Sequence, residues 1–203
     1  MGSTRGIALV VTLLALLVLV ALTGALIPLT SSETAISAHH RRAAQTLYAA
    51  EAAFEWALQE LQPVDSWDAL LAGSRRSALW AGPTTQRLAG GATLDLGRLT
   101  VELQRRGAGA SGAGRGLRWR LYAHGPLSAI LPRDPSLGLL RVAVWLADDP
   151  AETDGDPARD TNGVILLHAA GVGPSLARRA VQATLRRSDA ADRITPASWT
   201  LVR

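Results

Sequence analysis

The sequence predicts an α+β fold in which one long N-terminal helix packs on an antiparallel β-sheet. Three patterns in the 203 residues predict this fold. They are an uncharged apolar run at Ile7–Leu29, a one-sided helical pattern that continues to Leu61, and strand-like runs in the second half. The expected organisation is a leader at 1–6, a helix at 7–62 (apolar over 7–29, amphipathic over 30–62) and a sheet domain at 63–203.

The apolar run is long enough to cross a lipid bilayer. As a helix, Ile7–Leu29 spans about 35 Å, which matches the hydrocarbon core of a membrane. It is longer than the apolar region of a secretory signal peptide. Arg5 precedes it, so the positive-inside rule places the N-terminus in the cytoplasm. Because proline removes a backbone donor, the helix is expected to kink or loosen around Pro28.

The second half of the helix is apolar on one side only. Arginine and glutamate residues lie off this side, and Pro63 cannot continue a helix, so the helix is expected to end near Leu61–Gln62. The apolar positions recur at steps of three and four, at Ala43, Leu47, Ala50, Phe54, Ala57 and Leu61. This stripe is expected to pack on the sheet.

Two motifs in the first third of the chain carry a family resemblance. A short basic leader ends in Gly6 directly before the apolar helix, and Tyr-Ala-Ala-Glu-Ala-Ala-Phe-Glu-Trp-Ala-Leu occupies 48–58. With the residues at 5–11 and 22–24 and with Glu33, they resemble the N-terminal region of PilX-type minor pilins of type IV pili. The resemblance implies a pilin-like lollipop fold, cleavage after Gly6 by prepilin peptidase, and methylation of the new terminus at Ile7.

The same resemblance implies where the protein acts and with what. It would sit in the inner membrane as a single-pass protein and then join an extracellular pilus, with a role in assembly, adhesion or motility. Its partners would be other major and minor pilins, the inner-membrane assembly platform, prepilin peptidase and the lipid bilayer. Val11, Pro28 and Glu51 would pack in the filament. No nucleic-acid partner is expected, because the arginines are spread along the chain.

Val11 is the informative departure from major pilins. Those subunits carry glutamate at the fifth mature position, where it neutralises a neighbour's terminal amine in the apolar filament core, and an unpaired charge there is expensive. Val11 cannot do this. PilX-type minor pilins and GspK-type pseudopilins resemble this chain in lacking that glutamate. A position at or near the filament tip, where no earlier subunit's amine awaits a partner, is therefore the hypothesis.

Three other functions are alternatives to this hypothesis. A GspK-like minor pseudopilin of a type II secretion system shares the missing glutamate, but that family typically carries a large inserted helical subdomain, for which 203 residues leave little room. A permanently anchored periplasmic domain, with or without a bound metal, would need no cleavage at Gly6. Tip adhesion or DNA capture has no positive support from the dispersed arginines.

After the long helix, local patterns predict one short helix, a flexible loop and a set of strands. Asp65 and Ser66 can cap a short helix through Leu71 that Gly73 stops, and the glycine-rich stretch Gly107–Gly116 is expected to be a loop. Strands are expected at Ala92–Leu96, Arg98–Gln104, Leu117–His124, Leu139–Ala147, Val164–Ala170, Ala180–Arg187 and Ser198–Val202.

An acidic loop at 148–162 is a candidate calcium site. Calcium takes six to eight oxygen ligands from flexible loops. The chain has no cysteine, so a metal could provide the staple that disulfides give other extracellular domains. A solvated turn is the simpler interpretation, because Asp, Asn, Gly and Pro are the usual turn residues. The candidate ligands are Asp149, Asp154, Asp156, Asp160 and Asn162.

No catalytic site is expected. His39 and His40 are adjacent on a helix and so point to different sides. His124 and His168 lie in expected strands, with no Cys or Glu at metal-binding spacing beside them. No nucleophile-elbow sequence occurs. The protein is therefore predicted to be a structural subunit rather than an enzyme.

Overall fold

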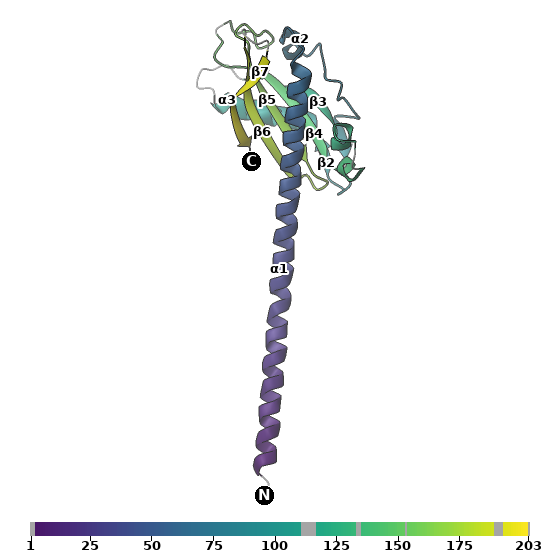
Figure 1. The fold of residues 1–203 in the computed structure, drawn as a ribbon, viewed down its shortest axis with the longest axis vertical. Coiled ribbons are helices and arrows are strands. Elements are labelled where there is room, and N and C mark those ends of the chain that lie inside the picture. The colour runs from purple at the N-terminus through teal and green to yellow at the C-terminus, as the bar shows by residue number, and fades with distance from the viewer. Residues whose placement is uncertain (1–2, 111–116, 133–134, 153, 189–192, 203) are drawn as a thin grey trace. The chain divides into compact units, whose positions relative to one another are not determined.

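The computed structural model describes residues 3–110, 117–132, 135–152, 154–188 and 193–202. The chain forms two compact units, Met1–Arg41 and Arg42–Arg203. Helix α1 (Ser3–Leu61) contributes its first part to one unit and its last part to the other. Figure 1 shows the fold of both units.

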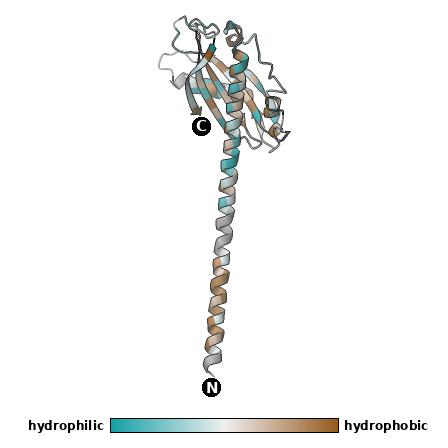
Figure 2. Ribbon diagram, in the orientation of Figure 1, coloured by the Kyte–Doolittle hydropathy of each residue, from teal (hydrophilic) through white to brown (hydrophobic). Residues whose placement is uncertain are grey.

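The first unit consists of the N-terminal part of α1. Residues Gly6–Gly24 have a mean hydropathy of 2.9, and the ribbon in Figure 2 is coloured mostly as hydrophobic near the N-terminal end of the helix. By length and composition, this segment could cross a membrane. The helix is not interrupted at Pro28, where the sequence led us to expect a kink or loosening; the side chains of 25–31 lie outside the described part. His39 and His40 are both exposed.

The second unit is built on a five-stranded antiparallel sheet. The strands follow one another in the sheet in the order in which they occur in the chain. Strand β5 is buried along its whole length, which marks it as the centre of the core. The strands are β3 (Arg120–Pro126), β4 (Arg141–Asp148), β5 (Val164–Val172), β6 (Arg178–Ser188) and β7 (Arg193–Val202).

One face of this sheet is covered by the last part of α1. Ala50, Phe54, Ala57 and Leu61 of the predicted stripe are buried, and they pack in one cluster with sheet residues of alternating positions such as Val144. Ala49 and Ala53 are also fully buried, so the contact surface is richer in alanine than the stripe alone suggested. Small side chains let a helix backbone come close to a sheet.

The opposite face of the sheet is covered by α3 (Leu96–Ala110). Leu96 and Leu99 are buried there with Trp119 and Trp145, and the indole Nε1 of Trp145 donates a 2.8 Å hydrogen bond to Oγ1 of Thr100. The sheet therefore has a helix on each face, and its core has two halves. The predicted α+β class with an antiparallel sheet is confirmed.

The strand predicted at Arg98–Gln104 is wrong, because these residues belong to α3. Their alternation also fits a helix, since Leu96, Leu99 and Leu103 recur at steps of three and four and all pack towards the sheet. The Asp95 carboxylate accepts a 2.9 Å hydrogen bond from the backbone N–H of Arg98, which caps the first turn.

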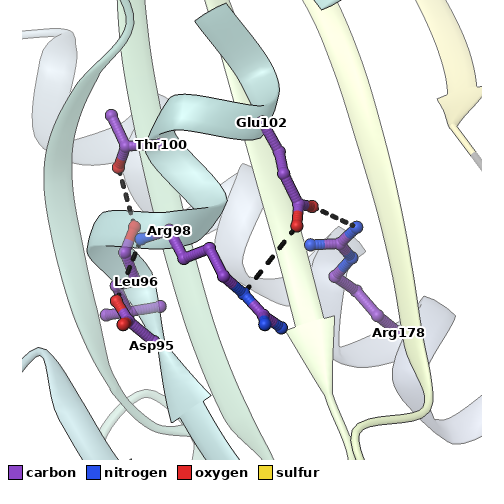
Figure 3. A network of polar contacts seen from close by, with 6 residues as sticks. All are labelled: Asp95, Leu96, Arg98, Thr100, Glu102 and Arg178. Atoms are coloured by element: carbon purple, nitrogen blue, oxygen red, sulfur yellow. Dashed lines mark hydrogen bonds and ion pairs between the residues drawn. The ribbon is translucent and has the colours of Figure 1, made fainter. Parts of the chain in front are cut away.

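Ion pairs on the outer side of α3 connect it to the sheet. Figure 3 shows the Glu102 carboxylate between two arginines, at 3.9 Å from Arg98 one turn earlier and at 3.6 Å from Arg178 of β6.

The flexible loop predicted at Gly107–Gly116 is wrong over its first residues, because Gly107–Ala110 form the last turn of α3. The rest of that prediction lies outside the described residues.

The remaining elements are short. Helix α2 (Asp68–Leu71) confirms the predicted short helix, and Gly73 beyond it has a positive φ of 76°. Its N-cap residue is Trp67 rather than the predicted Asp65 or Ser66, although the Ser66 Oγ accepts a 3.2 Å hydrogen bond from the Asp68 N–H. Strand β2 (Thr93–Asp95) lies within the predicted Ala92–Leu96. Its partner β1 (Thr85–Arg87) has no strand-like pattern in the sequence and was not predicted. Two 3₁₀ turns, η1 (Leu127–Ala129) and η2 (Pro135–Leu139), connect β3 to β4.

Candidate functional site

The N-terminal part of α1 carries apolar side chains that the single chain leaves uncovered. Over Gly6–Gly24 no side chain is buried, and Ile7 and Val11 are 61% and 58% exposed. An apolar surface that surrounds a helix on all sides requires lipid or other apolar helices around it. The predicted cleavage residues Gly6 and Ile7 lie at the start of this surface, and no neighbour lies within 4 Å of where a Cβ on Gly6 would be.

The polar groups of this segment are satisfied inside the helix. The Thr12 hydroxyl donates to the carbonyls of Ala8 and Leu9, at 3.1 and 2.9 Å, and the Thr23 hydroxyl donates to Leu19 at 2.8 Å. In a membrane or an apolar bundle, an unsatisfied hydroxyl would be costly, so these bonds make the segment compatible with both surroundings. Val11 supplies no charge to the segment.

The other predicted filament-packing residues fall in different places. Glu51 is half-buried in the second unit, beside the alanines that contact the sheet. Tyr48, one turn earlier, is 68% exposed. Pro28 continues the helix, but its side chain is among those the structure does not describe.

The acidic loop between β4 and β5 separates into turn residues and a carboxylate cluster. The Asp154 carboxylate accepts a bond from the Asp156 N–H (3.2 Å), and the Asp156 carboxylate accepts one from Ala158 (3.0 Å), as in ordinary turns. Asp149 accepts a 2.7 Å bond from the Asn162 amide. These four predicted ligands therefore make hydrogen bonds within the loop.

Asp160 is the predicted ligand that the fold brings to other carboxylates. Ligand oxygens of Asp148, Glu152 and Asp160 all lie within 4.8 Å of one another. The Asp160 carboxylate also accepts hydrogen bonds from the N–H groups of Gly163 (2.9 Å) and Val164 (3.2 Å). Asp148 and Glu152 lie in the loop already noted in the sequence, but nothing in their spacing marked them as the members that would meet.

The surroundings disfavour negative charge in this cluster. Burial, together with the charges of Glu152, Asp149 and Asp160, raises the pKa of Asp148 to about 7, although a backbone hydrogen bond from Asp149 opposes this effect. Burial also raises the pKa of Asp160, although the backbone hydrogen bonds from Val164 and Gly163 oppose this effect. The cluster thus gathers carboxylates that repel one another in a partly desolvated place.

The comparisons with known proteins address the first of these two regions. Residues 5–55 match the model of the PilX N-terminal family. Over these residues the chain is similar to PilX-type pilins. This confirms the resemblance drawn from the sequence motifs. No curated protein and no solved structure matches the chain.

The match indicates that the N-terminal segment is similar to that of type IV pilins. The PilX segment contains Gly6, Ile7, Val11 and Glu51, whereas the carboxylate cluster lies outside it. An apolar N-terminal helix is consistent with membrane anchoring of a pilin. The sheet and α3 are outside the matched residues.

Two histidines lie in strands, as expected, and both are buried. His168 lies 5.8 Å from the rings of Trp119 and Trp145, and its Nδ1 is 3.4 Å from the Gln182 side-chain oxygen. The His124 ring contacts Trp80 edge-on at 4.5 Å. Both imidazoles contact aromatic rings, one ring for His124 and two for His168, which fits a role in core packing.

Proposed function

We propose that the protein is a minor pilin of a type IV pilus that is incorporated at or near the filament tip, where it primes assembly or presents tip contacts. The observation that carries this proposal is the PilX match over 5–55 on a helix whose apolar side chains are uncovered over Gly6–Gly24. Such a helix needs two environments in turn, first lipid and then the helices of neighbouring subunits.

Processing is the first step of the proposed function. Prepilin peptidase would cleave between Gly6 and Ile7 and methylate the new N-terminus at the cytoplasmic side of the inner membrane. The assembly platform would then move the helix from the bilayer into the filament. Because the hydroxyls of Thr12 and Thr23 are already bonded within the helix, this transfer exposes no unsatisfied side chain in the apolar segment.

The tip position rests on the residue at the fifth mature position. In an apolar filament core, the carboxylate of an incoming subunit would stabilise the terminal amine of the subunit already in place. Val11 has no carboxylate, so this chain cannot make that pair. A subunit at the tip is not required to make it, because no earlier subunit's amine awaits a partner there.

The mature N-terminus tests the proposal. Mass spectrometry of the protein from pilus-forming cells is expected to find a chain that begins with methylated Ile7. Gly6→Val is expected to leave the leader attached and to abolish pilus incorporation. Gly24→Val is the matched control, because that glycine lies in the same apolar segment and has no neighbour within 4 Å of a Cβ position.

A leader that stays attached would contradict the proposed processing. If the protein keeps its leader in cells that process their other pilins, it is a permanently anchored domain and the proposal fails. For the tip position, immunogold electron microscopy of a tagged subunit is expected to label filament ends. Labelling along the shaft would refute the tip position, and Val11→Glu is the variant expected to move the label towards the shaft.

A further inference from the structure

Three carboxylates from separate positions converge at one end of the sheet. Asp148 is the last residue of β4, Glu152 follows in the loop, and Asp160 lies just before β5. Their ligand oxygens lie within 4.8 Å of one another. Like charges at this separation repel, so an acidic cluster that forms only by chance would be expected to spread apart.

The Asp148 side chain provides an independent observation. This residue is only 7% exposed, and its Oδ1 atom is buried without a hydrogen-bond partner in the described part of the chain. Buried polar atoms in native proteins almost always have a partner, and a carboxylate oxygen without one is costly. An orphaned oxygen that belongs to a three-carboxylate cluster indicates a missing positive ligand.

We propose that Asp148, Glu152 and Asp160 bind one Ca²⁺ ion. Calcium binds oxygen ligands at about 2.4 Å, so two oxygens on opposite sides of one ion are about 4.8 Å apart. The mutual distances in the cluster are within that limit, so all three carboxylates can reach a common ion. All three ligands are hard oxygens, which suits calcium better than zinc or copper.

The loop holds these ligands in place through further hydrogen bonds. The Glu152 carboxylate accepts bonds from the Thr161 N–H (2.7 Å) and the Thr161 hydroxyl (2.8 Å). Asp160 accepts bonds from the N–H groups of Gly163 and Val164. Metal-binding carboxylates are commonly oriented by such secondary hydrogen bonds. The cluster also opens to solvent, because Asp148 and Glu152 line a pocket of about 230 Å³ in which Ca²⁺ and its remaining water ligands could be accommodated.

The site would stabilise the end of the sheet that lies beside α2. The Asp160 backbone N–H donates a 2.9 Å bond to the Asp68 carboxylate of α2, so an ion on Asp160 would order that contact as well. In a chain without cysteine, calcium would then serve as the cross-link between β4, the loop and β5. This inference does not depend on the proposed pilin function, because the cluster lies outside residues 5–55.

A proton or an arginine could also relieve the repulsion among the three carboxylates. A proton on Asp148 would do so without a metal, and the exposed Arg118, which lines the same pocket, would neutralise charge from the solvent side. If a proton or Arg118 relieves the repulsion, the melting temperature should not change with Ca²⁺ in a way that depends on Asp148. Melting of the purified full chain in mild detergent, with millimolar Ca²⁺ or with a chelator, therefore distinguishes them from a bound ion.

The wild type is expected to melt roughly 5–10 °C higher when Ca²⁺ is about 100-fold above its Kd. Asp148→Asn and Glu152→Gln are each expected to lose this difference. Asp148→Asn should melt in chelator at or above the wild-type temperature, since the change removes a buried charge, and this shows that the variant folds. Asp154→Asn and Asp156→Asn are matched controls from the same loop and are expected to keep the full Ca²⁺ response.

Calorimetric titration with Ca²⁺ gives the stoichiometry, which should be one ion per chain. The proposal is overturned if the wild-type melting temperature is the same in Ca²⁺ and chelator. It is equally overturned if Asp148→Asn and Glu152→Gln keep the wild-type shift, because the ion would then bind elsewhere. If Asp148→Asn does not fold, Glu152→Gln decides alone, as its carboxylate is only partly buried.

Discussion

Gly171 of β5 lies in close contact with the backbone of α1 in the second unit. A Cβ on Gly171 would lie 2.1 Å from the Thr46 carbonyl oxygen and 2.9 Å from both the Ala49 Cβ and the Ala50 backbone nitrogen. Ordinary van der Waals contacts begin near 3.4 Å. Because these neighbours include helix backbone, no side-chain rotation can make room for a methyl group. Gly171→Ala would have to push the helix away from the sheet.

The free-energy cost of Gly171→Ala depends on the packing that this displacement of the helix disrupts. Overpacking a well-packed core costs about 1–3 kcal/mol and occasionally more. Here the moving element is a backbone that carries fully buried alanines, Ala49, Ala50 and Ala53, so the upper value applies. For a chain of this size, about 3 kcal/mol corresponds to a fall in Tm of roughly 6–12 °C. Gly173, two residues later, is the control, because a Cβ there would lie 3.3 Å from the Thr46 Cγ2, a side-chain atom.

Tryptophan fluorescence suits the measurement, since all six tryptophans lie in Arg42–Arg203. The full chain in mild detergent is heated, and the Tm values of wild type, Gly171→Ala and Gly173→Ala are compared. Gly173→Ala is expected to stay within about 1 kcal/mol of the wild type, because the Thr46 methyl can shift and the alanine restricts the unfolded chain. If Gly171→Ala melts within about 2 °C of the wild type, or if both variants are equally destabilised, the close packing of α1 on β5 is refuted.

Two further predictions concern His168 and Arg187, whose side chains have no role in the proposed function. Burial lowers the pKa of His168 to about 4, helped by the charges of Arg178 and Arg106 and opposed by the Gln182 hydrogen bond. The folded state therefore binds fewer protons than the unfolded state between pH 6.5 and 4, so the His168 contribution is complete above pH 6.5 and falls by about 3 kcal/mol as the pH drops to 4. Urea unfolding at several pH values should show a loss over this window that is smaller in His168→Gln; equal pH dependence in both proteins would contradict it. Arg187 donates hydrogen bonds to the carbonyls of Val64 and Asp65, and its guanidinium lies 4.6 Å from the Trp67 ring centroid. Arg187→Ala should cost about 2–3 kcal/mol in the same unfolding assay, while Arg186→Ala, at an exposed neighbouring position, should cost less than about 0.5; similar losses would show that the contacts of Arg187 add no stability.

The local periodicity of the sequence was sufficient to predict most strands of the sheet. Leu139–Ala147 and Val164–Ala170 are more continuously apolar than the other runs, and they became the buried strands β4 and β5 with small changes at their ends. The alternation in Ala180–Arg187 correctly predicted a strand that extends a few residues further on each side. For Ser198–Val202 the pairing with β6 extends the strand back to Arg193, because backbone pairing does not require an apolar pattern.

Periodicity failed where one pattern fits two structures. The segment Leu96–Leu103 alternates well enough for a strand, yet its leucines also form one side of a helix. The decision came from a distant part of the chain, since the Trp145 side chain and its bond to Thr100 give this side a surface to pack on. Nothing in the local sequence shows which face of the sheet needs a cover.

The two candidate sites also differ in whether the local sequence is enough to predict them. The apolar segment, the residues around Gly6, and Val11 are contiguous in the chain, so their chemistry can be found in the sequence, and the PilX family model matches there. The carboxylate cluster depends on where β4 ends and β5 begins. Asp148 is buried because it is paired with Ile165 in the sheet, and only this pairing brings it to Asp160.

The sequence by itself therefore determined the long helix, its change from apolar on all sides to apolar on one, and the missing charge at Val11. These properties arise from neighbouring residues, whose periodicity and hydropathy act over one or two helical turns. Tertiary structure alone decided that Leu96–Ala110 is a helix, that Gly171 must lack a side chain, and which carboxylates meet. Each of these depends on a contact between distant segments, and such contacts exist only after the sheet has formed.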